Sequence, residues 1–150
     1  MAVVVVGVLA ACDPGGSYHA PGGIVVMDDG RRYILGGASQ TQLRVHASWF
    51  TSSVHASVGI TNNGSTPLEI RPNELHMADR QGPLQPWERA VTCRHHEGAL
   101  VTLAPGETCE MRTTFSVTAD RDRLDKLTMT HDGVTRGGVA VPVSVILVMD

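Results

Sequence analysis

The sequence predicts one all-β domain built as an antiparallel β-sandwich of seven to nine strands. From about Ile24 onward, apolar and polar residues alternate with a period of two, which is typical of half-buried strands. Clusters of Gly, Pro and Asn separate these runs at short intervals. No segment sustains the period of an amphipathic helix. A chain of 150 residues is long enough for one core of ordinary domain size.

The clearest pair of strands covers residues 42–49 and 54–61. Every second residue is apolar in each run, so each strand has one dry face and one polar face. The apolar set is Leu43, Val45, Ala47 and Trp49 in the first run and Val54, Ala56, Val58 and Ile60 in the second. Residues 62–65, Asn-Asn-Gly-Ser, tolerate positive φ and are expected to end the second strand.

Further strands follow along the rest of the chain. We expect them over residues 67–70, 74–78, 87–93, 109–117, 124–130 and 139–148, with turns at residues 79–82, 104–107, 131–133 and 136–138. In the strand over 87–93, one face carries Trp87, Arg89, Val91 and Cys93, and we expect Trp87 to anchor the core.

Short strands at this spacing favour an immunoglobulin-like sandwich, with a small barrel as the alternative. Four stretches resemble the landmarks of immunoglobulin-like, sometimes called telokin-like, extracellular domains of bacterial lipoproteins of unknown function. They are residues 61–68 (TNNGSTPL), residues 79–82 (DRQG), residues 103–107 (LAPGE) and Phe115. The resemblance covers roughly Thr41 to Thr130. It implies the fold, and that family offers no catalytic residues to carry over.

The N-terminus resembles a bacterial lipoprotein signal. An apolar run is followed by Leu9-Ala10-Ala11-Cys12, which is similar to a lipobox. The run is too short to span a bilayer but has the length of a signal-peptide core. The resemblance implies a signal peptide over residues 1–11, a lipidated Cys12, and anchoring to the bacterial cell envelope outside the cytoplasm. The alternative is a buried N-terminal strand of Val residues that ends in a free cysteine.

Residues 12–23 are expected to form the lipidated cysteine and a flexible tether. The stretch from Asp13 to Gly23 is rich in Pro and Gly and has little to bury. The sandwich domain is therefore expected over residues 24–150.

Of the three cysteines, one lies in the lipobox and two lie in the expected sandwich domain. With Cys12 assigned to lipid, Cys93 and Cys109 remain as an even pair in a compartment where disulfides persist. A bridge of this loop size would contribute roughly 3 kcal/mol. The alternative is a pair of buried free thiols.

Composition and motifs exclude several classes of function. The formal net charge is -3 and no large basic cluster occurs, so nucleic acid is not an expected partner. The sequence contains no Gly-x-Ser-x-Gly elbow, phosphate-binding loop or His-Glu-x-x-His motif, so we expect no enzyme and no cofactor. An acidic loop of Asp120, Asp122 and Asp125 has interleaved basic residues, which favours a solvated loop over a calcium site.

Seven histidines form the remaining candidate constellation. Any register that buries Val45 and Val54 places His46 and His55 together on the opposite face, where two imidazoles could bind copper or zinc. His76, His95 and Met111 are further candidate ligands. The alternative is that these histidines are ordinary exposed polar residues.

These observations predict a non-enzymatic, lipid-anchored module that binds another envelope protein or a surface polymer. A periplasmic copper- or zinc-binding domain using His46 and His55 is the alternative function.

Overall fold

The computed structural model describes residues 15–21, 24–28, 31–38, 40–117 and 121–150. These residues form a nearly all-β molecule with antiparallel sheets in a sandwich-like arrangement, which confirms the predicted fold class. Fifteen strand segments lie within them, and nine have five or more residues. The predicted signal peptide and Cys12 lie outside the described residues.

The elements follow one another in a simple order. The strands of the first half are β1 (Gly15–His19), β2 (Ile24–Asp28), β3 (Arg31–Ala38), β4 (Thr41–Phe50), β5 (Ser53–Asn62), β6 (Leu68–Ile70), β7 (Leu75–Asp79), β8 (Gly82–Pro83) and β9 (Gln85–Pro86). Those of the second half are β10 (Val101–Leu103), β11 (Thr108–Ser116), β12 (Lys126–His131), β13 (Val134–Arg136), β14 (Val139–Ala140) and β15 (Val143–Met149). A 3-10 turn, η1 (Pro72–Glu74), and a single helical turn, α1 (Arg121–Leu124), interrupt them.

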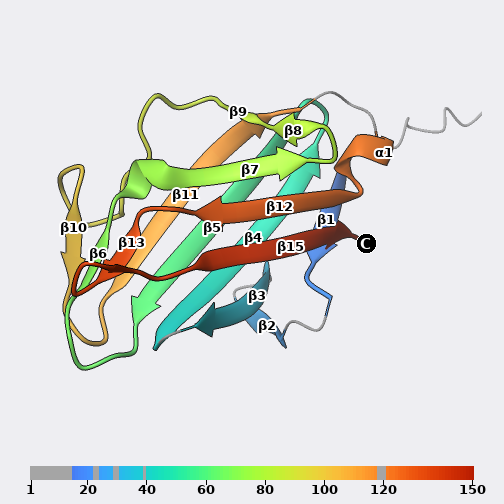
Figure 1. Cartoon of the computed structure of the whole chain (residues 1–150). Helices are drawn as coiled ribbons and strands as arrows, with labels where there is room; N and C mark the ends of the chain where they lie inside the picture. Colours follow the sequence, from blue (N-terminus) through green and yellow to red (C-terminus); the bar gives the residue numbers. More distant parts are fainter. Residues whose placement is uncertain (1–14, 22–23, 29–30, 39, 118–120) are drawn as a thin grey trace, which may run out of the picture.

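Two layers of strands pack across each other (Figure 1). One layer has the order β2-β3-β4-β5-β11-β9, and the other has the order β15-β12-β7-β8. Strand β1 pairs with β4 through residues 15–17 and with β15 through residues 18–19, so it joins the layers along one side. A small sheet of β10, β6, β13 and β14 lies at one end of the molecule (Figure 1).

The core lies between the two layers, where the apolar column of each strand points inward. Along β4 and β5, all eight apolar residues predicted to face the core are buried. Met111 and Phe115 of β11 meet them from the same layer, and Met77, Leu127 and Leu147 come from the other. Burial of this alternating set is the main stabilising contribution to the sandwich.

The strand predicted over residues 87–93 does not form, and Trp87 is not a core residue. Strand structure ends at Pro86, and the Trp87 side chain is 57% exposed. The backbone N–H of Trp87 donates to Thr114, and that of Arg94 donates to Glu110. Seven steps of chain therefore run beside only four steps of β11, so the segment must leave the regular ladder as a loop.

Part of the predicted tether belongs to the fold. Residues 15–19 form strand β1, and Tyr18 is only 2% exposed. Its hydroxyl donates to the Leu124 carbonyl at 2.9 Å, and burial together with the Asp125 charge raises the pKa of Tyr18. Burial of this one large side chain, together with the ladders to β4 and β15, offsets the entropy of ordering a Gly- and Pro-rich stretch.

The remaining differences are local. The predicted strand over 124–130 begins with the turn α1, and the one over 139–148 divides at Pro142 into β14 and β15, since Pro lacks an N–H for the ladder. No helix among the described residues has the length and hydropathy to cross a membrane.

Candidate binding face

The side of the larger layer that points away from the core carries a concentration of polar and aromatic side chains. Along β4 the even-numbered residues point outward, along β5 the odd-numbered ones, and along β11 the even-numbered ones. We call this surface the outer face. The second layer covers the other side of these strands (Figure 1), so the outer face retains much of its exposure to solvent.

A hollow of about 50 Å³ lies near the middle of the outer face. Gly59 of β5 forms its floor, because it has no side chain between Arg44 of β4 and Glu110 of β11, its partners in register. Tyr33, Ser57 and Arg112 complete the wall. We call this feature the Gly59 hollow. A Cβ atom built on Gly59 would meet only ordinary contacts at 3.7 Å or more. The space around this position could therefore accommodate a side chain, and close packing does not require glycine here.

The walls of the Gly59 hollow combine an aromatic ring with both signs of charge. The Arg44 guanidinium lies 3.6 Å from the centre of the Tyr33 ring, a cation–π contact that holds both side chains in place. The His46 ring packs at 5.7 Å from Tyr33. Among the described residues, no ion pair within 4 Å engages Glu110 or Arg112. The hollow therefore offers a cation, an anion and a hydroxyl to a polar ligand.

Two exposed aromatic residues lie at one end of the outer face. Phe50 ends β4 and is 51% exposed, and Trp87 follows β9. Phe50 pairs with Gly15 on one side and Ser53 on the other, and Ser53 pairs with Ser116. The Trp87 indole N–H donates to Ser116 at 2.5 Å. The backbone of Trp87 lies opposite Thr114, but its indole reaches the end of the cross-strand row that begins at Phe50. We call this row, with the two aromatic side chains, the aromatic row.

The loop of residues 87–94 holds Trp87 in place and covers the edge of β11. Glu88 accepts hydrogen bonds from the Thr113 hydroxyl at 2.9 Å and the Thr114 N–H at 3.1 Å. Burial raises the pKa of Glu88, but these hydrogen bonds outweigh it, and the pKa is lowered overall. At the other end of the loop, the predicted disulfide joins Cys93 to Cys109, with 5.0 Å between their Cα atoms. Both cysteines are buried beside the core, as predicted.

His46 and His55 share the outer face, as predicted, but they are diagonal neighbours and do not oppose each other. His46 pairs with Ser57, and His55 pairs with Ser48. The two ring nitrogens of His55 lie 3.2 Å from the Ser53 hydroxyl and 3.1 Å from the Thr114 hydroxyl. Its ring also meets the Trp87 indole edge-on at 6.4 Å. His55 therefore lies between the Ser53 and Thr114 hydroxyls, beside the Trp87 indole.

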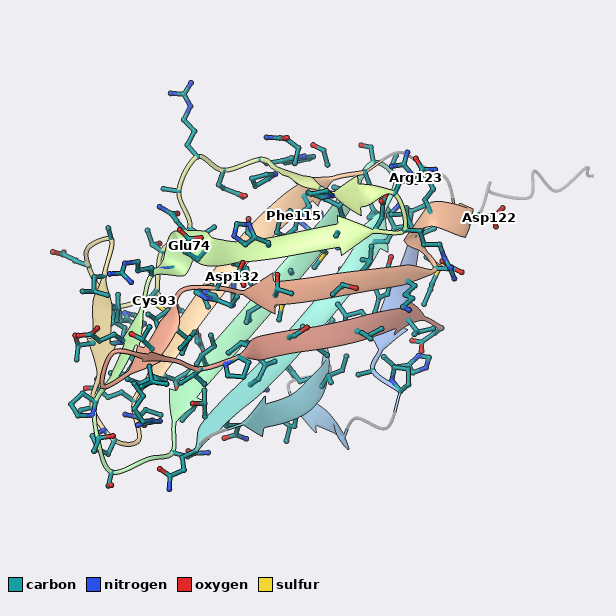
Figure 2. All side chains as sticks on the ribbon, viewed as in Figure 1. Glu74, Cys93, Phe115, Asp122, Arg123 and Asp132 are labelled. Carbon is teal, nitrogen blue, oxygen red and sulfur yellow. A yellow bond between two sulfur atoms is a disulfide. The ribbon has the colours of Figure 1, made fainter. Side chains whose placement is uncertain are left out.

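The other candidate metal ligands do not come together. Met111 points into the core, whereas His76 is exposed on β7 of the other layer, near Glu74 at 3.4 Å and Asp132 at 3.7 Å. Figure 2 shows Glu74 and Asp132 on these neighbouring segments. His95 lies in the loop after Cys93 with φ of 65°. The described part of the chain contains no group of three or more His, Cys, Asp or Glu residues that could hold a metal ion.

The acidic loop is tied to basic side chains. Arg80 donates two hydrogen bonds to the Asp125 carboxylate, at 2.6 and 2.8 Å. Arg123, labelled with Asp122 in Figure 2, lies 2.9 Å from Asp79. The side-chain hydrogen bond from Arg80 lowers the pKa of Asp125. Asp120 lies outside the described residues. This pairing favours a structural loop.

Sequence reasoning missed most of the outer face. It did not single out Tyr33, Arg44, Phe50, Gly59 or Arg112, and it placed Trp87 in the core. Two signals were available: Phe50 is a large aromatic in the polar column of its strand, and Gly59 is a glycine inside a strand, which often marks a close approach by another group.

Comparison with known proteins adds no family to this description: no family model and no curated protein matches the chain.

Proposed function

We propose that this protein is a non-enzymatic, membrane-anchored binding module of the bacterial envelope. Its lipid would be attached at Cys12, and the Gly59 hollow on the outer face would bind another envelope protein or a surface polymer.

The observation that carries this proposal is the Gly59 hollow. A rigid sheet there presents a stacked Tyr33–Arg44 pair, an anion and a second cation around an open floor. Because the cation–π contact already holds Tyr33 and Arg44, little entropy of this pair is lost when a ligand binds them. Arg and Tyr are also the residue types that dominate binding energy at interfaces. A protein segment or an envelope polymer with polar groups suits this surface.

A binding experiment with isolated envelopes tests the role of the hollow. The Cys12→Ala chain, which carries no lipid, would be sedimented with envelopes from the source organism, so that the anchor itself does not bring the protein down. Gly59→Leu fills the hollow and Arg112→Glu reverses its exposed cation, and each is expected to weaken binding about tenfold, the equivalent of 1.4 kcal/mol. Gly59→Ala is the matched control, since its Cβ makes only ordinary contacts. Equal sedimentation of Gly59→Leu and the wild type would contradict the proposal.

The anchor has a separate test. Intact mass of the membrane-extracted protein is expected to show loss of residues 1–11 and a lipid-sized gain on Cys12. Cys12→Ala is expected to abolish both changes. An unprocessed chain without added lipid would refute anchoring.

A further inference from the structure

The aromatic row lies at the point where the described chain begins. Gly15 opens β1 and pairs with Phe50, so the two residues are neighbours across the strands. The row continues through Ser53 to Ser116, which accepts the hydrogen bond from the Trp87 indole. Phe50 is 51% and Trp87 is 57% exposed. Both large aromatic side chains therefore remain in contact with solvent at this end of the fold: Phe50 is next to Gly15, and Trp87 lies at the other end of the row, beyond β5 and β11.

The sequence sets how far this row can lie from an anchored Cys12. Cys12 precedes Gly15 by three residues, and three residues of fully extended chain span at most about 10 Å. A lipid on Cys12 would hold Gly15 within that distance of the membrane surface. Because Phe50 pairs directly with Gly15, the aromatic row has no long tether separating it from the bilayer.

We infer that the aromatic row is a second membrane contact, in which Phe50 and Trp87 lie in the interfacial region of the lipid bilayer. This inference rests on the proposed lipid anchor at Cys12. An indole is amphipathic and is enriched at membrane interfaces, and Phe50 adds apolar area beside it. A second contact would fix the orientation of the domain on the bilayer, in addition to the attachment that the lipid on Cys12 provides.

The contact is apolar in character. The α1 turn and the β7–β8 turn lie at the same end of the molecule (Figure 1). Their arginines Arg80 and Arg123 are paired with Asp125 and Asp79. These two arginines therefore add little attraction to anionic lipid, and the contact is expected to form in neutral phosphatidylcholine.

The same geometry sets the position of the Gly59 hollow. Arg44 lies six residues before Phe50 on β4, which corresponds to roughly 20 Å along the strand. With the aromatic row in the interface, the hollow would stand clear of the lipid head groups and remain open to a partner in the envelope.

The test uses the full chain, purified from membranes, in phosphatidylcholine vesicles, with and without brominated acyl chains that quench tryptophan fluorescence on contact. Trp49→Phe leaves Trp87 as the only tryptophan, and Trp87→Phe leaves the buried Trp49 as the matched control. We expect brominated vesicles to quench Trp87 at least twofold and to leave Trp49 almost unchanged. Phe50→Ser is expected to reduce the quenching of Trp87, whereas Leu100→Ser, which changes an exposed apolar residue in the segment before β10, is not.

Vesicle flotation separates the two claims. A chain that floats with the vesicles while Trp87 is not quenched overturns the membrane contact and leaves the anchor standing. A chain that does not float overturns the anchor, and the inference fails with it.

Discussion

Asn62 shows how one buried polar side chain organises the end of the sandwich opposite the aromatic row. It is fully buried, and its amide donates to the carbonyls of Thr66 and Leu103 at 2.9 and 3.0 Å. Its carbonyl oxygen accepts from the Gly64 N–H and from Arg136, both at 3.0 Å. All four hydrogen-bonding positions of the side chain are used, which makes the amide costly to replace.

We expect Asn62→Ala to lower the free energy of unfolding by about 3 kcal/mol, because it leaves several buried groups without partners. Urea unfolding would measure the loss. Asn63→Ala, at the exposed neighbouring position, should change stability by less than about 0.5 kcal/mol. Similar losses for the two variants would mean that the Asn62 hydrogen bonds do not organise this end.

His131 makes stability depend on pH. Its side chain is 2% exposed, Nδ1 accepts from the Gly133 N–H at 3.1 Å, and Nε2 has no partner. Burial, reinforced by the charge of His76 and opposed by Asp132 and Glu74, lowers the pKa of His131 to about 4 from 6.5. Between these two values the unfolded chain binds a proton that the folded chain does not, so stability falls as the pH drops through this window.

At pH 4, the lowered pKa of His131 reduces the free energy of unfolding by about 3 kcal/mol relative to its value above pH 6.5. We expect His131→Asn, which keeps an acceptor for Gly133, to lose less stability than the wild type between pH 6.5 and pH 4. Urea unfolding at a series of pH values checks this. His95→Asn, at an exposed residue of positive φ, should follow the wild-type profile. A wild-type profile for His131→Asn would show that another group causes the acid loss.

Among the elements, those with a regular apolar column were predictable and those fixed by distant contacts were not. Strands β4, β5 and β11 lie within one residue of their predicted bounds, since burial of every second side chain sets both the strand and its orientation. The loop of residues 87–94 also contains spaced apolar residues. The path of this loop depends instead on the contacts of Glu88 and Cys93 with β11, and the local sequence does not indicate these contacts.

The disulfide should therefore stabilise both the fold and the position of Trp87. We expect the double variant Cys93→Ser/Cys109→Ser to lose roughly 3 kcal/mol of unfolding free energy. Hydrogen exchange at the Thr114 amide, which Glu88 covers, should become faster. Reductant should reproduce both effects in the wild type and have no effect on the double variant. Unchanged exchange at Thr114 would show that Glu88 holds its place without the bridge.

For the whole molecule, the fold class could be predicted from the sequence, whereas the class of function stays a prediction for which the outer face is a candidate surface. Local patterns predicted the sandwich fold, which the structure confirms, and they also suggested a lipobox, which stays a prediction. The Gly59 hollow was not, because it joins Tyr33, Arg44 and Arg112 from three strands whose register only the folded sheet defines. The proposed orientation places the aromatic row at the membrane and the hollow away from it.

The most direct test of this account is site-specific photo-crosslinking in intact cells. A photoreactive side chain at Gln42 would report from the outer face beside the Gly59 hollow, and one at Val139, which is 69% exposed on β14, would serve as the control. We predict a discrete adduct from position 42 that disappears when Gly59→Leu is also present, and none from position 139. Equal adducts from both positions, or an adduct at position 42 that survives Gly59→Leu, would contradict binding through the outer face.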